Sequence, residues 1–476
     1  FFFEPETVRE LSPIMATRKQ PVEDRDRVKR LDDKIVIEFG GSPGCTAIMI
    51  FSPILMYYFW ACIEYYQGAL QYPGSVEGET LWDVLPYLSR MWGHVYEGAY
   101  PTLKAFQIYT YFMIFQIIIA IVLPGPIIEG LPIPSRNFTR LKYLCNGISA
   151  WYTTVIVSFL LHWYDYFNLV EIIDNLGPIM TWSIFWGNLI TVVTYFGAII
   201  TGNTHRMSGM FLYDLFMGAW LNPRIGPLDL KMWAEIRIPW VLLFYVSLSA
   251  ALKQYQDYGY ITAASGFMVL AHLLYVNACH KGEECIPTTW DIFYEKWGYM
   301  LIFWNMSGVP FLYCHSSHYL TKFAPGQHEE SLPWTVFMYT LLLVGYYIWD
   351  TANSQKNRFR MQLQDTYIDR KTFPQLPWGT LKNPSYIKTK QGSLLLTGGW
   401  WGIARKIHYT ADLMMAFSWG GITGFGSCIP YFYVLFFTIV LVHRVSRDME
   451  RCSEKYGTDW DRYCKEVPYI FIPYVF

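Results

Sequence analysis

The chain contains a series of apolar runs, each about as long as a helix that crosses a bilayer, and these runs limit its possible folds. A helix of about 20 residues spans the roughly 30 Å hydrocarbon layer, because each residue adds about 1.5 Å. The sequence therefore predicts an all-α, polytopic integral membrane protein with about ten transmembrane helices. The candidate spans lie at about residues 44–66, 103–124, 149–170, 178–201, 238–252, 259–279, 298–320, 334–351, 408–423 and 425–442.

The composition agrees with lipid as the main solvent of the chain. Hydrophobic residues make up 53% of the sequence and charged residues only 16%, whereas charged residues are about a quarter of an ordinary soluble domain. The net charge of −1 gives no electrostatic reason to expect a nucleic-acid partner.

The distribution of positive charges predicts the orientation in the membrane, because Lys and Arg gather on the cytoplasmic side. With ten spans and a cytosolic N-terminus, 33 of the 37 Lys and Arg residues fall on the cytosolic side. Arg90, Lys253 and Lys322 fall on the opposite side, and Lys104 lies at the edge of the second span. Glycines between residues 420 and 426 separate the last two spans, which form either one broken helix or a hairpin. Ten spans place both termini in the cytosol.

This topology predicts three parts. Residues 1–43 are expected to form a cytosolic N-terminal extension, and residues 44–442 a transmembrane domain with a cytosolic loop at 352–407. Residues 443–476 are expected to form a cytosolic C-terminal segment. The 352–407 loop is the largest polar insert, so solvent-facing chemistry is expected there first.

The nine cysteines are odd in number and include no C-x-x-C pair. Several, such as Cys62, Cys314 and Cys428, stand in apolar segments, so buried free thiols are expected. Neither the cysteines nor the histidines have the spacing of a metal site, and we predict no metal.

Two groups of polar residues suit a phosphate-bearing ligand. Asn353, Lys356 and Arg360 follow the eighth span with three- and four-residue spacing, so they share a helix face. Arg444 and Asp448 share a face after the last span, where an arginine can hold phosphate and an acid can accept hydrogen bonds. A positive flank of a membrane helix is the alternative for each group. No strand-linked G-x-G-x-x-G motif or Walker loop is present, so a nucleotide would have to bind between helices.

Acidic groups near the membrane are candidates for a proton donor. A purely structural His-Asp contact is the alternative for the run from His408 to Asp412. A solvated loop is the alternative for the polar run 280–297, and it is favoured for Glu283. The segment 212–224 is interpreted as an interfacial segment in which Asp214 pairs with Arg224. The catalytic candidates are Glu284, Asp291, Tyr294, Glu295 and Asp412.

These residues resemble the sterol reductase family that includes sterol C14 reductases, 7-dehydrocholesterol reductase and the lamin B receptor. The resemblance covers about residues 40–476 and is strongest at Leu221-Asn222-Pro223-Arg224, at 356–360, and at the H-R-x-x-R-D-x-x-R-C-x-x-K-Y-G-x-D-W-x-x-Y-C run of 443–464. It implies a ten-helix bundle in the endoplasmic reticulum membrane whose C-terminal half binds NADPH. The cofactor-binding candidates are Asn353, Lys356, Arg360, Trp401, His408, Tyr409, Arg444, Arg447, Asp448 and Tyr456.

Within the family, two segments look like the fungal branch that reduces the C24(28) double bond of an ergosterol precursor. They are Lys281–Asp291 and Tyr469–Phe476. Where C14 reductases carry N-Y-x-G-D, this chain has His408-Tyr409-Thr410-Ala411-Asp412, so an imidazole replaces an amide, which fits a branch with another substrate.

The implied reaction is the last step of ergosterol synthesis, with the sterol drawn from the bilayer. An acid would protonate the exocyclic methylene, and the tertiary cation at C24 would accept hydride. The alternatives are reduction of the C14 or C7 double bond, a membrane methyltransferase, and a sterol-binding protein without catalysis.

The orientation can be tested at the sequon Asn137-Phe138-Thr139, which falls on the cytosolic side. We expect Asn137 to carry no glycan, because glycosylation takes place in the lumen. Digestion with an endoglycosidase should leave the electrophoretic mobility unchanged, and a shift that disappears in Asn137→Gln would overturn the orientation.

Overall fold

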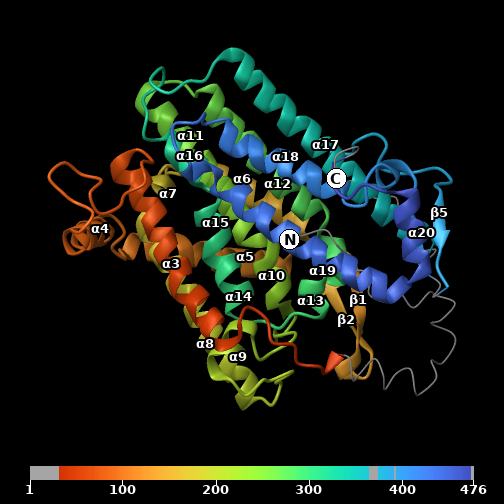
Figure 1. Ribbon diagram of the computed structural model, residues 1–476. Helices are drawn as coiled ribbons and strands as arrows, with labels where there is room; N and C mark the ends of the chain where they lie inside the picture. Colours follow the sequence, from red (N-terminus) through yellow and green to blue (C-terminus); the bar gives the residue numbers. More distant parts are fainter. Residues whose placement is uncertain (1–31, 364–373, 391–392, 473–476) are drawn as a thin grey trace. The chain divides into compact units, whose positions relative to one another are not determined.

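The computed structural model describes residues 32–363, 374–390 and 393–472 (Figure 1). Contacts within the chain divide the described residues into two compact units. The first unit comprises residues 32–330 and 423–430, and the second comprises those within 331–422 and 431–472. Most of the expected N-terminal extension, and the last four residues of Tyr469–Phe476, lie outside the described residues.

The first unit is mainly helical, with two short antiparallel hairpins. The strands are β1 (Ile127–Ile133) with β2 (Thr139–Leu144), and β3 (Arg224–Ile225) with β4 (Leu228–Asp229). The α-helices are α3 (Gly41–Tyr66), α4 (Val84–Gly98), α5 (Leu103–Val122), α6 (Gly147–Trp163), α7 (Glu171–Asp174), α8 (Leu176–Ile200), α9 (Phe211–Met217), α10 (Leu230–Arg237), α11 (Pro239–Tyr258), α12 (Ala263–Lys281), α13 (Trp290–Phe293), α14 (Tyr299–Phe303), α15 (Val309–Leu312) and α16 (His315–Leu320).

Side-chain caps mark where several of these helices begin. Thr102 accepts a hydrogen bond from the Ala105 amide before α5, at 3.3 Å. Thr262 caps α12 in the same way, and Asp229 accepts from the Met232 amide, at 3.1 Å, before α10. Each cap satisfies a backbone donor that has no partner inside its helix.

The seventh expected span, 298–320, is broken rather than continuous. A π-helical turn, Trp304–Gly308, separates α14 from α15. The carbonyl of Met306 would normally accept from residue 310, but Pro310 has no N–H to donate. The Tyr109 hydroxyl of α5 donates to that carbonyl instead, at 2.7 Å. A neighbouring helix therefore supplies the hydrogen bond that the proline removes.

The second unit contains three longer helices, a shorter fourth helix and a small β-hairpin. The helices are α17 (Leu332–Leu363), α18 (Ile407–Gly421), α19 (Phe432–Tyr456) and α20 (Thr458–Glu466), and β5 (Tyr386–Lys388) pairs antiparallel with β6 (Leu394–Leu396). A 3-10 turn, Gly399–Gly402, precedes α18. Residues of α19, α20 and the β-hairpin share one apolar cluster that includes Ile387, Leu395, Trp460 and Tyr463.

Helices α18 and α19 form an antiparallel hairpin. Near its closed end, the rings of Trp419 and Tyr433 stack with centroids 4.9 Å apart. At the other end, the Lys406 ammonium lies 2.7 Å from the Asp448 carboxylate. Contacts at both ends fix the hairpin, which resolves the alternative of one broken helix.

The all-α, polytopic membrane architecture is confirmed, and the count of ten spans is approximate. Seven helices are long and apolar enough to cross a bilayer within the described part of the chain. Two further expected spans correspond to α6 and α18, of 17 and 15 residues, and the broken span is the third. The helix expected at 334–351 continues to Leu363, and the last begins at Phe432 and continues to Tyr456.

All nine cysteines are free. Six are buried, including Cys62 and Cys314, which agrees with the expected buried thiols. Cys428 is exposed, so its expected burial was wrong. It lies in the glycine-rich connection between α18 and α19.

Glu283 was expected in a solvated loop, and this prediction is wrong. Its residue exposure is only 2%, and its carboxylate lies 2.6 Å from the Arg237 guanidinium of α10. It also accepts the Gly147 amide at the start of α6, at 2.5 Å. The same guanidinium donates to Asn146, at 2.6 Å. Glu283 is therefore buried although it lies in a short connection, because its carboxylate binds groups at the end of α10 and at the start of α6.

Removing one partner of this pair should destabilise the protein. Glu283→Gln leaves the Arg237 charge buried without a counter-ion, which costs roughly 3 kcal/mol or more. Thermal unfolding in detergent should occur at a clearly lower temperature than for the parent chain. Arg237→Met combined with Glu283→Met should recover part of the loss, and an unchanged transition in Glu283→Gln would show that the pair is unimportant.

Candidate functional site

The second unit contains all ten cofactor candidates, and five of them form one connected set with Lys406: Lys356, Trp401, His408, Tyr409 and Asp448. On α17, Asn353, Lys356 and Arg360 are half-buried, and their three- and four-residue spacing places them on one face of this helix. The same helix fixes the turn that precedes α18. Gln355, fully buried, accepts from the Trp400 amide at 3.0 Å and donates to the Trp378 carbonyl at 2.9 Å.

Trp401 is fixed by this arrangement and faces Lys356. Its indole N–H donates to the Ala352 carbonyl of α17, at 2.9 Å. The Lys356 ammonium lies 4.1 Å from the Trp401 ring centroid, within the range of a cation–π contact. The ring of His408 lies 5.0 Å from Trp401 and 4.3 Å from Tyr409. A row of aromatic rings therefore runs from the cation on α17 to the start of α18.

The row ends at a buried ion pair between Lys406 and Asp448 of α19. The two side chains are only 9% and 12% exposed, and the Lys406 ammonium also lies 5.7 Å from the Tyr409 ring. Asp448 was expected to bind the ligand together with Arg444 of the same helix. The structure shows that Lys406 is a further cation beside Asp448. Lys406 was not among the predicted site residues, because its partner Asp448 lies 42 residues later in the sequence. Its position two residues before His408 was the only local sign of a role in the site.

The end of the chain holds Arg405 and Lys406 in place. The amides of Arg405 and Lys406 donate to the carbonyls of Tyr469 and Ile470, at 2.9 and 2.8 Å. The Thr410 hydroxyl donates to the Phe471 carbonyl, at 2.6 Å. The Arg405 guanidinium donates to the Pro468 carbonyl at 3.1 Å, and it also contacts Cys464. These bonds position two cations that lie outside the regular helix.

The remaining cofactor candidates lie on the same helices, α17 and α19. Arg444 lies one turn before Asp448 and is half-buried, whereas Arg447 is exposed on α19. Tyr456 packs in the apolar cluster with Trp460, with the Lys455 ammonium 4.7 Å from its ring centroid. The Asn353 amide donates to the Trp349 carbonyl of its own helix, at 2.9 Å.

Asp412 is the one catalytic candidate in this unit. It lies on α18 one turn after His408 and is 6% exposed. The Trp349 side chain forms a hydrogen bond with its carboxyl group. Among the described residues, its Oδ1 atom is shielded from solvent and has no hydrogen-bond partner. A buried carboxyl group with one open oxygen can hold a proton for transfer.

The other four catalytic candidates lie in the first unit, where several serve as fold contacts. The Glu295 carboxylate accepts the Trp290 indole N–H, at 2.6 Å, and Asp291 is buried. The Arg206 guanidinium lies 3.8 Å from the Tyr294 ring centroid. Burial raises the pKa of both Tyr294 and Glu295. Glu284 is half-buried.

The expected pair between Asp214 and Arg224 does not form. Asp214 is 1% exposed and accepts the amides of Ser208 and Gly209, at 2.9 and 3.0 Å. Arg224 instead pairs with Asp229, at 2.9 Å, across the short β3–β4 hairpin. The backbone amides of Ser208 and Gly209, rather than Arg224, provide the hydrogen bonds of the buried Asp214 carboxylate.

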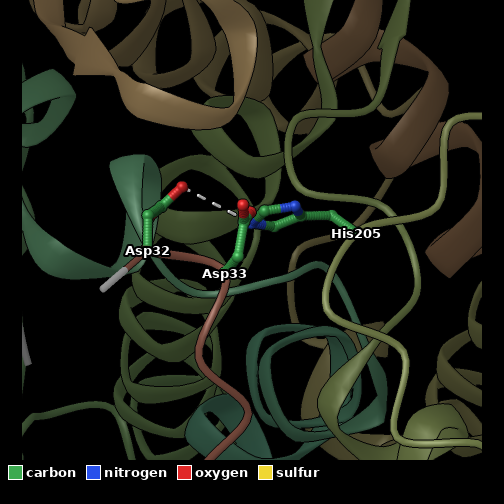
Figure 2. A group of neighbouring side chains, drawn as sticks. All are labelled: Asp32, Asp33 and His205. Atoms are coloured by element: carbon green, nitrogen blue, oxygen red, sulfur yellow. Dashed lines mark ion pairs between the residues drawn. The ribbon is translucent and has the colours of Figure 1, made fainter. Parts of the chain in front are cut away.

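Asp32, Asp33 and His205 meet in the first unit and offer donor atoms that metals accept (Figure 2). His205 Nε2 lies 3.7 Å from Asp32 Oδ2. Burial, with smaller contributions from Arg206, Lys296 and Arg136, lowers the pKa of His205 to about 4. These cations oppose a further positive ion, and Asp33 is exposed. The expected absence of a metal stays a prediction.

Comparisons with known proteins agree with the residue patterns. The model of the family described as "Ergosterol biosynthesis ERG4/ERG24 family" matches residues 33–476. The chain is 46% identical over 453 residues to the Delta(24(24(1)))-sterol reductase erg4A of Aspergillus fumigatus, covering 95% of each chain. It is 44% identical to the Delta(24(24(1)))-sterol reductase of Gibberella zeae, covering 92% of this chain and 73% of the relative.

More distant relatives carry another activity in their names. The chain is 37% identical over 446 residues to the Delta(14)-sterol reductase of Methylotuvimicrobium alcaliphilum, covering 93% of this chain and 97% of the relative. The match to the family spans both structural units and every candidate site residue. The chain therefore belongs to the ergosterol biosynthesis ERG4/ERG24 family of sterol reductases.

Proposed function

We propose that the chain uses NADPH to reduce the C24(28) double bond of an ergosterol precursor, of the ergosta-5,7,22,24(28)-tetraenol type, as the last step of ergosterol synthesis. The observation that carries the cofactor part is the connected set from Lys356 through Trp401, His408 and Tyr409 to the Lys406–Asp448 pair. The names of the two fungal relatives support the choice of double bond.

The residues present fit a phosphorylated dinucleotide. Such a ligand carries several negative phosphates and flat ring systems, which cations and aromatic side chains bind. Within the described residues, the buried Arg405 Nε has no hydrogen-bond partner, so one donor is available to a ligand. We assign phosphate contacts to Lys356, Arg360, Lys406 and Arg444, and ring or sugar contacts to Asn353, Trp401, His408, Tyr409, Arg447, Asp448 and Tyr456.

The reaction needs a proton and a hydride, because an isolated alkene is a poor hydride acceptor. When bound, NADPH supplies the hydride. Asp412 is our preferred proton donor, because it is the candidate in the same unit as the cofactor set and has an open carboxyl oxygen. Protonation of the terminal methylene carbon would leave a tertiary cation at C24. The apolar helices keep water from that cation. Glu284, Asp291, Tyr294 and Glu295 stay candidates.

The remaining expectations concern placement in the cell. We propose residence in the endoplasmic reticulum membrane, with both termini in the cytosol and the sterol entering from the bilayer. The division into residues 1–43, 44–442 and 443–476 stays a prediction. The 352–407 segment and the C-terminal segment then lie on the cytosolic side, where NADPH is supplied.

The function can be tested with the purified chain in lipid nanodiscs. A C24(28)-unsaturated sterol and NADPH deuterated at the transferable position should give a product with deuterium at C24, located by mass spectrometry. Sterols unsaturated at C14 or C7 serve as controls. Turnover of a control sterol with none of the C24(28) sterol would contradict the proposal, as would use of S-adenosylmethionine.

The Lys406–Asp448 pair should be required for cofactor binding. Asp448→Asn removes the carboxylate that holds Lys406 in place and that we assign to a ring or sugar contact. A charge-assisted hydrogen bond is worth about 1.5–3 kcal/mol, or roughly 10- to 150-fold in Kd. Equilibrium titration with NADPH should show a loss of this size. Arg462→Gln, at an exposed position of α20, is the matched control. Equal Kd values for Asp448→Asn and the parent chain would remove the pair from the cofactor site.

Asp412→Asn separates proton transfer from cofactor binding. The amide has nearly the same shape but cannot supply the proton, and general acid catalysis contributes typically about 100- to 10,000-fold. We expect kcat to fall by about 100-fold or more while the Kd for NADPH stays within about twofold. If kcat is retained, another of the five candidates is the donor.

A further inference from the structure

Helix α4 carries a continuous stripe of large apolar side chains on its outer face. The stripe consists of Leu85, Leu88, Trp92 and Tyr96, which are 78%, 53%, 70% and 61% exposed. Their spacing of three, four and four residues places them on one side of a helix. Trp82, just before the helix, is 92% exposed. Few soluble proteins leave so large an apolar surface in water.

The opposite face of α4 is anchored to the end of α3, which fixes the direction of the stripe. The His94 ring stacks on Tyr65 at 4.0 Å, and its Nε2 lies 2.8 Å from the Tyr66 hydroxyl. The Tyr87 hydroxyl donates to the Gln71 carbonyl, at 3.3 Å, and Met91 is buried. In Figure 1, α4, in orange, lies beside this end of α3. The helix cannot turn its apolar side inward without losing these contacts.

The connections of α4 place it at the edge of the membrane. It follows the end of one candidate span, α3, and precedes the start of another, α5. The Thr181 hydroxyl, in the second turn of α8, donates to the Ala99 carbonyl at 2.7 Å. The Trp182 indole donates to the Thr102 carbonyl, at 2.9 Å. The end of α4 is therefore level with the first turns of a third candidate span.

Exposed aromatic residues gather on the same side of the membrane. Helix α6 ends at Trp163, and α8 begins shortly afterwards, so their connection lies on this side too. Trp163, Tyr164 and Tyr166 are 70%, 65% and 81% exposed, and Tyr100 is 53% exposed. Tryptophan and tyrosine at the ends of spans are typical of the boundary between lipid and water. The Tyr96 ring of α4 lies 5.6 Å from the Tyr100 ring, so the stripe on α4 meets this aromatic group.

We propose that α4 lies in the interfacial layer of the bilayer, with Leu85, Leu88, Trp92 and Tyr96 inserted at the boundary between headgroups and acyl chains. Arg90 pairs with Glu79, and Glu97 is exposed beside the stripe, so the charged flank of the helix faces the headgroups. The occupant is lipid rather than a protein partner, because the stripe meets Tyr100 and lies on the same side of the membrane as the exposed aromatic residues at the ends of neighbouring spans. This proposal is independent of the reaction.

Spin labels on the full chain in lipid nanodiscs test the proposal. A nitroxide is attached to p-acetylphenylalanine at Leu85, Trp92 or, as the matched control on the same helix, Glu97. This coupling leaves the native cysteines unlabelled. Labels at Leu85 and Trp92 should collide more with oxygen and less with a water-soluble nickel chelate than the label at Glu97.

The opposite pattern would overturn the proposal. If labels at Leu85 and Trp92 meet the nickel chelate as often as the Glu97 label, the stripe lies in water. Unfolding temperatures of the labelled chains within about two degrees of the parent chain show that the fold is intact, since all three positions are exposed.

Discussion

The packed interior of this chain offers no water to a polar group, so a buried donor, acceptor or charge without a partner inside the protein is costly. The broken seventh span shows the constraint at the backbone, where the Tyr109 hydroxyl satisfies the carbonyl that Pro310 leaves open. Arg237 and Glu283 show it for charges in the first unit. Lys406 and Asp448 show it in the second, where their pair joins the open end of the α18–α19 hairpin.

The same constraint explains why the nucleotide site that we propose in the second unit needs no glycine-rich loop. A cation that is already held by an aromatic ring or an acid needs little reorganisation to receive a phosphate. Lys356 is held by Trp401, and Lys406 is held by Asp448 and by the chain end at Ile470. Asp412 differs from these residues, because its open oxygen suits proton transfer rather than phosphate binding.

Long apolar runs predicted the helices well, because hydropathy over about 20 residues reports directly on membrane insertion. The face shared by Lys356 and Arg360 was predictable because it depends only on the local spacing of residues along a helix. Lys406, Asp214 and Glu283 were not, because their partners come from distant segments or from backbone groups. The strands β1 and β2 were also missed, since a hairpin in a polar connection has no apolar alternation strong enough to reveal it.

The central claim is that the connected set on α17, α18 and α19 holds NADPH. An electron cryomicroscopy map of the full chain with NADPH in nanodiscs, compared with a map without it, tests this claim most directly. The account predicts new density for the phosphates within hydrogen-bond distance of Lys356, Lys406 and Arg444. Cofactor density elsewhere, with these three side chains unchanged between the maps, would contradict it.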